Sequence, residues 1–388
     1  MNKFLKEFKD RGFFYQCTSE DELSKLLDKE KINGYIGFDC TAESLHVGSL
    51  LQIMCLRLLQ KHGHRPIVLL GGGTTRIGDP SGKDKTRTIL SEEEIEKNIK
   101  NIEKILKNFL NIKDPKTKPI FVNNYSWLKN LNYISFLRDI GKHFTINKML
   151  SFDSVKTRLE REQSLSYMEF NYMILQAYDF LELNKKENCT LQMGGSDQWG
   201  NIVNGVDLIK RHSNKRAYGL TTPLITLASG AKMGKTESGA VWLDKKFLSP
   251  YEYWQFWRNI DDRDVLKFIK IFTDIDTDKI EKIKNNNINE LKILLANKAT
   301  EMLHGEQEAK NSEETAKQTF GDNSMGDNLP SISIEEKELK SKITIIDLII
   351  LSKLESSKSE IRRLIIGNGI KINNQVVADE KLIVTKDL

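Results

Sequence analysis

Cysteine is scarce in this chain of 388 residues, and its four copies are scattered along the sequence as Cys17, Cys40, Cys55 and Cys189. No two of them form a Cys-x-x-Cys pair, and the six histidines include no His-Glu-x-x-His sequence. Disulfide bonds and a zinc site are therefore not expected, and we predict no metal ion held by the protein's own side chains.

Long apolar runs are also missing. No stretch approaches the roughly 18 apolar residues of a membrane span. Residues 1–14 are charged throughout and lack the apolar core of a signal peptide. We therefore expect no membrane association and a cytoplasmic location. The excess of one charge is small, a net +5, which permits a nucleic-acid partner without arguing for one.

A strand–helix–strand pattern is present near the N-terminus. Residues 34–39 form a short apolar run, residues 46–62 have apolar side chains at helical spacing, and residues 65–70 form a second apolar run. This order predicts a βαβ unit, and so a parallel sheet with ligands at the carboxyl ends of its strands. Further strands are expected at 119–122 and 190–193. The predicted fold class is α/β, with a Rossmann-like parallel-sheet catalytic domain.

The rest of the chain suggests three more segments. Residues 223–320 begin with a glycine-flanked loop and then read as helix, and we expect a helical domain there after a catalytic domain of residues 1–222. Residues 321–333 are rich in glycine, asparagine, aspartate and serine, which predicts a linker. Residues 334–388 are expected to form a small α+β domain.

The turn after the first predicted strand carries a candidate phosphate site. Residues 38–49 read Phe-Asp-Cys-Thr-Ala-Glu-Ser-Leu-His-Val-Gly-Ser, and we expect a helix to begin near His46. The free N–H groups of a helix N-terminus suit a phosphate, and a histidine there can donate to a phosphate oxygen. Gly48 lets a ribose or adenine lie against the backbone. The alternative is a surface histidine and a helical glycine without a ligand.

A second candidate lies much later in the chain. Residues 232–236 read Lys-Met-Gly-Lys-Thr within a glycine-flanked loop. Two lysines and a hydroxyl on such a loop can follow a polyphosphate as charge moves onto its leaving group. The alternative is a solvated basic loop.

The two motifs, in this order and around a βαβ core, resemble the two signature motifs of class I aminoacyl-tRNA synthetases. Residues 71–83 resemble the branch that the tyrosyl and tryptophanyl enzymes share, and residues 172–179 and 191–201 resemble tyrosyl enzyme motifs. The similarity spans residues 33–260 most strongly. The resemblance implies a ligase that activates L-tyrosine with ATP, as its Mg²⁺ complex, and then charges tRNA(Tyr). It implies no tightly bound cofactor. It also implies a homodimer, for which residues 133–150 are a candidate contact surface.

The spacing of Tyr172, Gln176 and Asp179 places them on one face of a helix. A face packed into the core would be apolar, and a buried glutamine and aspartate are costly without a ligand or partner. In enzymes that the sequence resembles, the positions of Asp79, Tyr172 and Gln176 hold the ammonium group of tyrosine. Those of Tyr35 and Asp179 bind its phenol. The same resemblance implies that Gln192 and Asn124 also line the pocket. For Asn124, a simple role in a turn is an equally weighted alternative.

The resemblance assigns the ATP site as well. Asp197 is expected to accept from the ribose hydroxyls, beside Gly195, Gln198 and Asp39. Thr41, His46 and Gly48 are expected on one side of the phosphates. Residues expected to close on them from the other side are Lys232, Lys235 and Thr236, together with Lys83 and Arg87.

The sequence departs from the family at two positions. Cys40 stands where proline is usual, which predicts a looser turn. Ser49 stands where a second histidine or asparagine is common, and no catalytic role is assigned to it.

The C-terminal segment resembles a small RNA-binding domain shared with a ribosomal protein. We expect helices at 343–354 and 358–366, the second carrying Arg362 and Arg363, followed by a glycine turn and a strand. In that family the basic helix faces RNA phosphates. The alternative is an amphipathic helix without RNA.

Three other functions remain open at this level. A tryptophanyl enzyme shares the fold, but it does not need Tyr35 and Asp179 at the far end of the substrate's aromatic ring. A small-molecule nucleotidyltransferase shares the first motif but explains neither the second motif nor the C-terminal segment. A non-catalytic RNA-binding relative has no reason to keep both phosphate motifs.

Overall fold

The computed structural model describes residues 2–79, 90–230, 233–236, 239–321, 343–352, 354–355, 357–373 and 375–385. The chain divides into two compact units. One comprises Met1–Thr236 and Ala240–Glu314, and the other comprises Glu237–Gly239 and Thr315–Leu388. Within the described residues, no helix is long and apolar enough to cross a membrane.

A six-stranded sheet forms the centre of the first unit, in the order β1-β6-β5-β2-β3-β4. All neighbours are parallel except β1, which pairs antiparallel with β6 at the edge. The predicted α/β parallel sheet is therefore confirmed. The strands are β1 (Gln16–Cys17), β2 (Asn33–Phe38), β3 (Arg65–Leu70), β4 (Ile120–Asn123), β5 (Cys189–Gly195) and β6 (Tyr218–Thr222).

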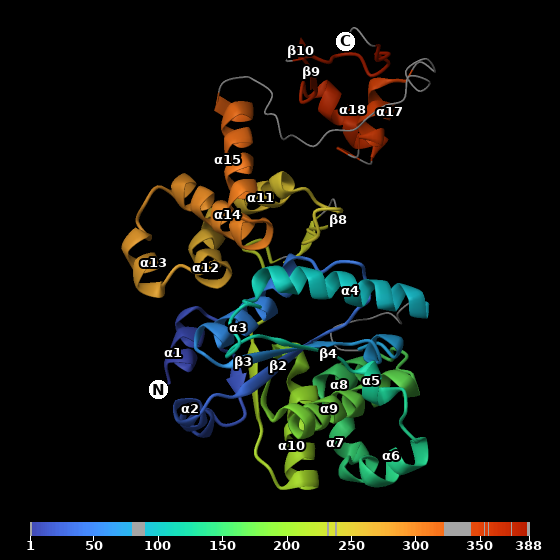
Figure 1. Cartoon of the computed structure of the whole chain (residues 1–388). Coiled ribbons are helices and arrows are strands. Elements are labelled where there is room, and N and C mark those ends of the chain that lie inside the picture. The colour runs from blue at the N-terminus through green and yellow to red at the C-terminus, as the bar shows by residue number, and fades with distance from the viewer. Residues whose placement is uncertain are drawn as a thin grey trace. The chain divides into compact units, whose positions relative to one another are not determined.

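Helices cover both faces of this sheet (Figure 1). On one face lie α3 (Leu50–Lys61) and α4 (Glu92–Phe109); on the other lie α9 (Tyr167–Glu187) and α10 (Trp199–Ser213). Both α4 and α9 begin with a capping box, in which a serine and the glutamate three residues later satisfy backbone N–H groups. The shorter helices of this unit are α1 (Lys3–Asp10), α2 (Glu20–Lys29), α5 (Tyr125–Leu128), α6 (Tyr133–Asp139), α7 (Ile146–Leu150) and α8 (Asp153–Glu160).

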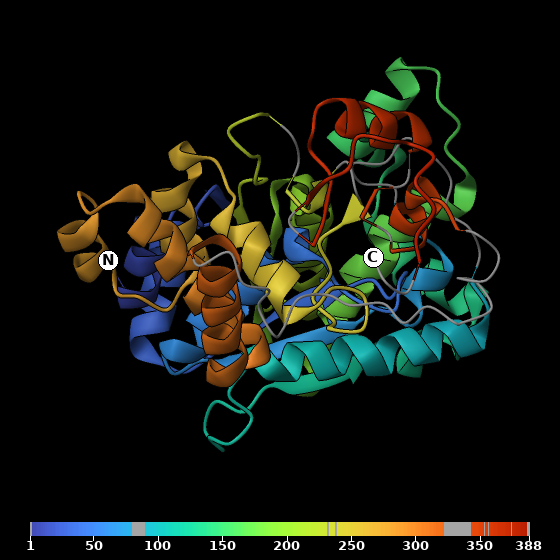
Figure 2. The same cartoon turned by 90° about the horizontal axis from the view of Figure 1, so that it is seen from above.

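The expected helical stretch follows the sheet. Its first helix has a capping box from Ser249 to Glu252, with Pro250 in the first turn, where a proline costs no hydrogen bond. The stretch lies close to α1 in both cartoon views (Figures 1 and 2), and Arg11 at the end of α1 donates to the carbonyl oxygens of Lys270 and Thr273. The helices are α11 (Pro250–Arg258), α12 (Asp262–Phe272), α13 (Thr277–Ile283), α14 (Ile288–His304) and α15 (Glu306–Gly321).

The second unit contains its own small core. Its elements are α17 (Ile345–Leu351), α18 (Lys358–Ile366) and the antiparallel pair β9 (Lys371–Ile372) and β10 (Gln375–Val376). The core consists of the buried aliphatic side chains Ile345, Ile346, Ile349, Ile361, Ile365 and Val377.

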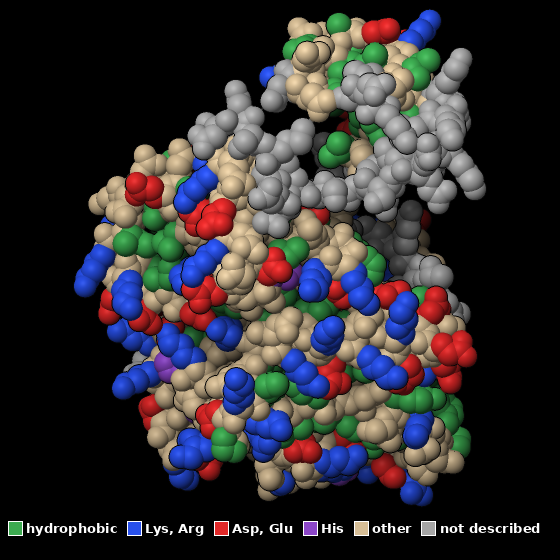
Figure 3. All heavy atoms as spheres, turned by 45° about the horizontal axis from the view of Figure 1, so that its top comes forward, with side chains coloured by type: hydrophobic (Ala, Val, Ile, Leu, Met, Phe, Trp, Pro, Cys, Tyr) green, Lys and Arg blue, Asp and Glu red, His purple; other side chains and the backbone are tan. Residues whose placement is uncertain are grey.

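The surface of the first unit carries both signs of charge. On the face drawn in Figure 3, Lys and Arg side chains are interspersed with Asp and Glu. The charges on this face are therefore not of a single sign, which agrees with the small net charge of the chain.

Candidate active site

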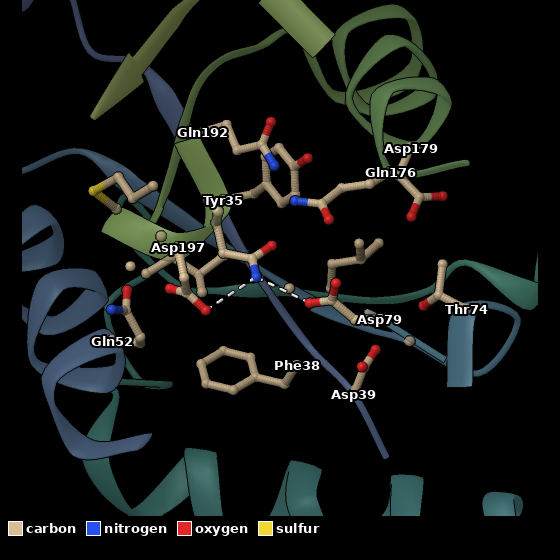
Figure 4. A pocket seen from close by; sticks show the side chains of 18 of the residues that line it. Tyr35, Phe38, Asp39, Gln52, Thr74, Asp79, Gln176, Asp179, Gln192 and Asp197 are labelled. Atoms are coloured by element: carbon tan, nitrogen blue, oxygen red, sulfur yellow. Dashed lines mark hydrogen bonds between the residues drawn. The ribbon is translucent and has the colours of Figure 1, made fainter. Parts of the chain in front are cut away.

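A cavity of about 320 Å³ opens at the carboxyl ends of the central parallel strands (Figure 4). Ligands of such sheets bind at this edge, because the strand order there leaves a crevice between loops. The register of β2 against β5 places Tyr35 directly beside Gln192. Residues predicted from the sequence that line the cavity are Tyr35, Asp39, Gly48, Asp79, Tyr172, Gln176, Asp179, Gln192, Gly195, Asp197 and Gln198.

The closed end of the cavity is built around Asp179, whose side chain is 1 % exposed. Its Oδ1 accepts from the indole Nε1 of Trp127 at 2.8 Å, and its Oδ2 accepts from Nδ2 of Asn124 at 2.9 Å. Burial raises the pKa of Asp179 to about 7, although these two hydrogen bonds lower it. This carboxylate is therefore held in one orientation and is expensive to ionise without a further donor.

Tyr35 faces the same end of the cavity from β2. Its hydroxyl is buried and has no hydrogen-bond partner among the described residues. Burial, and next the charge of Asp179, raise the pKa of this phenol well above its ordinary value. A buried hydroxyl without a partner costs free energy. The Oε1 atom of the neighbouring Gln192 is buried and unpartnered in the same described region. Both atoms offer hydrogen bonds to a ligand.

Asn124 is fully buried and acts through its neighbours, since it does not line the cavity. Its Oδ1 accepts from the backbone N–H of Gly73 at 2.7 Å, and its Nδ2 donates to Oγ1 of Thr74 at 3.0 Å as well as to Asp179. This side chain therefore ties the turn after β3 to the carboxylate on α9.

The middle of the cavity gathers three carboxylates. Tyr172 donates to Oδ1 of Asp39 at 3.3 Å. The amide nitrogen of Gln198 donates to Oδ2 of Asp79 at 2.9 Å and lies 3.4 Å from Oδ2 of Asp197 (Figure 4). Such a concentration of negative charge attracts a cationic ligand group. Among the described residues, no group of three or more His, Cys, Asp or Glu side chains is arranged to hold a metal ion.

Gln176 is oriented by a neighbour. Its Oε1 accepts from Nδ2 of Asn201, at the start of α10, at 3.0 Å. Asn201 also donates to Oε1 of Gln198 at 3.2 Å. The amide groups along this wall of the cavity are thus joined in one network.

The two sequence motifs meet at Gly48, which lines the cavity, whereas His46 and Gly234 do not line it. The backbone N–H of Gly48 donates to Nδ1 of His46 at 3.0 Å. A Cβ atom on Gly48 would lie 2.6 Å from Cε1 of His46 and 3.0 Å from the carbonyl oxygen of Met233. Gly234, with φ +98°, comes so close that its own Cβ would lie 2.8 Å from the nitrogen of Gly48. Both glycines are required by this close approach.

The helix expected near His46 begins later. His46 remains extended and pairs with Trp242 in a β-bridge, a 3₁₀ turn follows at Val47–Ser49, and α3 starts at Leu50. The pairing with Trp242 could not be read from local sequence, and it holds His46 out of the helix. The N–H of Cys40, which a proline would lack, donates to Oγ1 of Thr75 at 2.8 Å. The looser turn expected at this position stays a prediction.

Other predicted residues lie outside the cavity lining or outside the described residues. Thr41 is exposed and does not line the cavity. Lys235 and Thr236 form β7 (Lys235–Thr236), a two-residue strand shortly before β8 (Gly239–Ala240), and only their backbone is described. Those that lie outside the described residues are Lys83, Arg87 and Lys232.

Sequence reasoning missed three residues of the site. Trp127 and Thr74 position Asp179 and Asn124. Gln52, one turn after Gly48, lines the cavity; its Nε2 donates to Oγ1 of Thr222 at 2.9 Å, and its Oε1 is unpartnered in the described part of the chain. The i, i+4 spacing from Gly48 to Gln52 was the available signal for Gln52.

Comparison with known proteins identifies the family of the chain. The family model "tRNA synthetases class I (W and Y)" matches residues 27–321. The chain is 84 % identical over 388 residues to a tyrosine–tRNA ligase of Pelagibacter ubique, covering 100 % of this chain and 95 % of that one. It is 52 % identical to the tyrosine–tRNA ligase of Rickettsia rickettsii, covering 98 % and 94 %.

Solved structures show the same relationship. A C-terminally truncated mitochondrial tyrosyl-tRNA synthetase of Aspergillus nidulans is 30 % identical with a TM-score of 0.73, covering 82 % of this chain and 94 % of that one. A tryptophanyl-tRNA synthetase of Plasmodium falciparum, 16 % identical with a TM-score of 0.58, covers 79 % of this chain and 84 % of its own, and shares the fold. The chain belongs to the class I aminoacyl-tRNA synthetases, in the bacterial-type tyrosyl branch of the group shared with the tryptophanyl enzymes.

Proposed function

We propose that this ligase joins L-tyrosine to ATP, giving tyrosyl-adenylate and pyrophosphate, and then transfers the tyrosyl group to the 3′ end of tRNA(Tyr) in the cytoplasm. The choice of tyrosine as the amino acid rests on the residues at the closed end of the cavity. There the hydroxyl of Tyr35, which has no hydrogen-bond partner in the described part of the chain, lies near the buried carboxylate of Asp179. The full-length similarity to tyrosine–tRNA ligases supports the same reaction.

Recognition of the phenol follows from these two groups. The ligand's hydroxyl donates to Asp179 and accepts from Tyr35, so that the hydrogen bond missing from Tyr35 is made. Phenylalanine has no hydroxyl, so it would leave Tyr35 and Asp179 without this hydrogen-bonding partner. Tyrosyl-tRNA synthetase is a standard case of such a site, which rejects phenylalanine by roughly 10⁵-fold without editing.

The ammonium group binds among the carboxylates and amides in the middle of the cavity. Asp79, Tyr172 and Gln176 hold it, and Gln198 fixes the position of Asp79. This places the ligand's carboxylate toward the open end, where Gly48 leaves room for the nucleotide. Asp197 accepts from the ribose hydroxyls beside Gly195.

The tyrosine carboxylate attacks the α-phosphate of ATP, which enters as its magnesium complex. The nucleophile is already ionised, so no general base is needed. Catalysis then consists of positioning and of stabilising charge on the departing pyrophosphate. His46 and Thr41 act from the first motif, and Lys232, Lys235 and Thr236 act from the second. Lys83 and Arg87 complete the set of phosphate-binding side chains.

The second unit is the proposed RNA-binding domain. Arg362 and Arg363 stand on α18, where they pair at 3.1 Å with Glu380 and Glu360. These pairs are solvent-exposed and weak, so RNA phosphates can replace the acidic partners. Deletion of residues 334–388 should spare adenylate formation and impair charging at limiting tRNA; unchanged charging would refute this role.

A homodimer is proposed from the surface of α6 and α7. Their exposed aliphatic and aromatic side chains lie within the predicted range 133–150, and gathered exposed apolar side chains mark many protein interfaces. The side chains are Tyr133, Ile134, Leu137, Ile146 and Leu150. Replacing Ile134 with aspartate should yield a monomer in sedimentation; an unchanged species at the same concentration would contradict this interface.

The assignment is tested by ATP–pyrophosphate exchange with tyrosine, phenylalanine and tryptophan. Tyrosine alone should support exchange, and tryptophan-dependent exchange would overturn the proposal.

Lys235→Ala should slow the tyrosine-dependent exchange by roughly 10²–10³-fold, the usual cost of losing one such donor. Tyrosine binding should change little, and near-normal exchange by this variant would remove Lys235 from the mechanism.

A further inference from the structure

The segment just after the second motif runs antiparallel to the first motif. We call residues 241–247 the strap. The backbone N–H of Val47 donates to the carbonyl oxygen of Val241 at 2.9 Å, and the N–H of Leu243 donates to that of Leu45 at 2.9 Å. Between these bonds, His46 and Trp242 stand opposite each other as a bridge pair. The backbone alone therefore fixes the strap against residues 45–47.

The side chains of the strap make a second set of contacts. The indole of Trp242 meets the imidazole of His46 edge to face, with ring centroids 6.3 Å apart and planes at 66°. Phe247 packs on Trp242 with centroids 5.9 Å apart and is itself 47 % exposed. The three rings form a short aromatic row that ends in solvent, so packing of a hydrophobic core does not account for it.

The imidazole of His46 is held from several directions. Its Nδ1 accepts the N–H of Gly48, which in the neutral ring leaves the proton on Nε2. A Cβ atom on Gly234 would lie 2.7 Å from Nδ1, so only glycine leaves room for the imidazole there. Rotation of the ring would break the hydrogen bond from Gly48 and change the edge-to-face contact with Trp242.

We propose that Trp242 is a positioning residue that holds the imidazole of His46 in the plane from which its Nε2–H reaches the phosphates of ATP. The inference rests on the proposed role of His46 as a phosphate donor. Misplacement of a catalytic donor by about 1 Å can cost roughly 10²-fold in rate, so a side chain that only fixes a ring plane can have a large effect.

The first test compares Trp242→Leu, which removes the aromatic ring, with Trp242→Phe, which keeps one. Trp242→Leu should lower kcat for tyrosine-dependent ATP–pyrophosphate exchange about tenfold, while KM for tyrosine stays within about twofold of the wild type. Trp242→Phe should restore kcat to within about threefold. The matched control is Lys245→Ala, an exposed change in the same strap, which should leave kcat unchanged.

The second test places the same changes on a His46→Ala background. If Trp242 acts through His46, Trp242→Leu should have no further effect there, because coupled residues are not additive. The same tenfold loss on both backgrounds would overturn the inference while leaving the role of His46 intact. Full exchange activity of His46→Ala alone would instead refute the phosphate role of His46.

A third variant covers the case in which Trp242→Leu does not fold. Phe247→Ala keeps Trp242 and removes only the outer ring of the row. It should lower kcat by about threefold in the wild type and have no effect with His46→Ala. An equal loss on both backgrounds, or no loss on either, would overturn the inference.

Discussion

The two ends of the active-site cavity are built differently. At the phenol end, a strand and two helices bring Tyr35, Trp127 and Asp179 together, and all three side chains are buried. At the phosphate end, two chain segments meet through Gly48 and Gly234, and the contacts are mainly with the backbone. The first end is proposed to select its ligand through side-chain hydrogen bonds. The second depends on how closely two loops can approach, so changes at the two ends should have separable effects.

The largest effect is expected from Asp179→Asn at the phenol end. The variant's amide nitrogen would face the donor of either Trp127 or Asn124, and one buried donor would lose its acceptor. The preference for tyrosine over phenylalanine, measured as the ratio of kcat/KM in pyrophosphate exchange, should fall by about a hundredfold or more. KM for ATP should not change. An unchanged preference would show that the phenol is recognised elsewhere.

Gly48→Ala should have the next largest effect, and at the opposite end. The new methyl group would lie within 3.0 Å of the His46 ring and reach the carbonyl oxygen of Met233, so the two motifs must move apart. We expect kcat for exchange to fall by roughly 10²-fold. Tyrosine affinity, measured by equilibrium dialysis, should be unchanged. If Gly48→Ala instead bound tyrosine more weakly and kept a normal kcat, the two ends of the cavity would not have separable effects.

Trp127→Phe should have a smaller effect, confined to the phenol end. It removes one donor to Asp179 while keeping an aromatic ring, at a cost of about 1 kcal/mol, or about fivefold in KM for tyrosine. The lost hydrogen bond should also raise the pKa of Asp179 further above 7. Equal losses with tyrosine and phenylalanine would mean that Trp127 only shapes the cavity.

The smallest expected effect is a pH dependence. Burial raises the pKa of Asp179 from 3.8 to about 7, so the folded chain holds this proton more tightly than the unfolded chain. Its contribution to stability is present below pH 4 and is lost as the pH rises through 7. A bound phenol donates to the ionised carboxylate, and tyrosine affinity should therefore increase severalfold from pH 6 to 8. Asp179→Asn should bind tyrosine independently of pH; a matching pH curve for this variant would assign the titration to another group.

Sequence reasoning was most successful where local spacing carries the information. Tyr172, Gln176 and Asp179 were expected on one helix face, and α9 does present all three to the cavity. It failed where distant segments meet. The bridge from His46 to Trp242 delays the start of α3, and Trp127 gains its partner only when α5 packs beside α9. Neither contact leaves a periodic signal in the sequence. The parallel sheet was predictable because apolar strands alternate with helices.

The central strand β2 has a consequence for the size of the substrate. Tyr35 stands within this strand and Asp39 directly follows it, so the groups proposed to bind the phenol and to face the nucleotide are separated by four residues of nearly extended chain. That is roughly 13 Å at the usual rise per residue. Because β2 is paired with β3 through Phe38, this spacing can change little. An amino acid that makes the hydrogen bonds of the phenol but differs in length would present its carboxylate too near to, or too far from, the α-phosphate. If the proposed roles of Tyr35 and Asp39 hold, the sheet would select substrates by length as well as by hydrogen bonding.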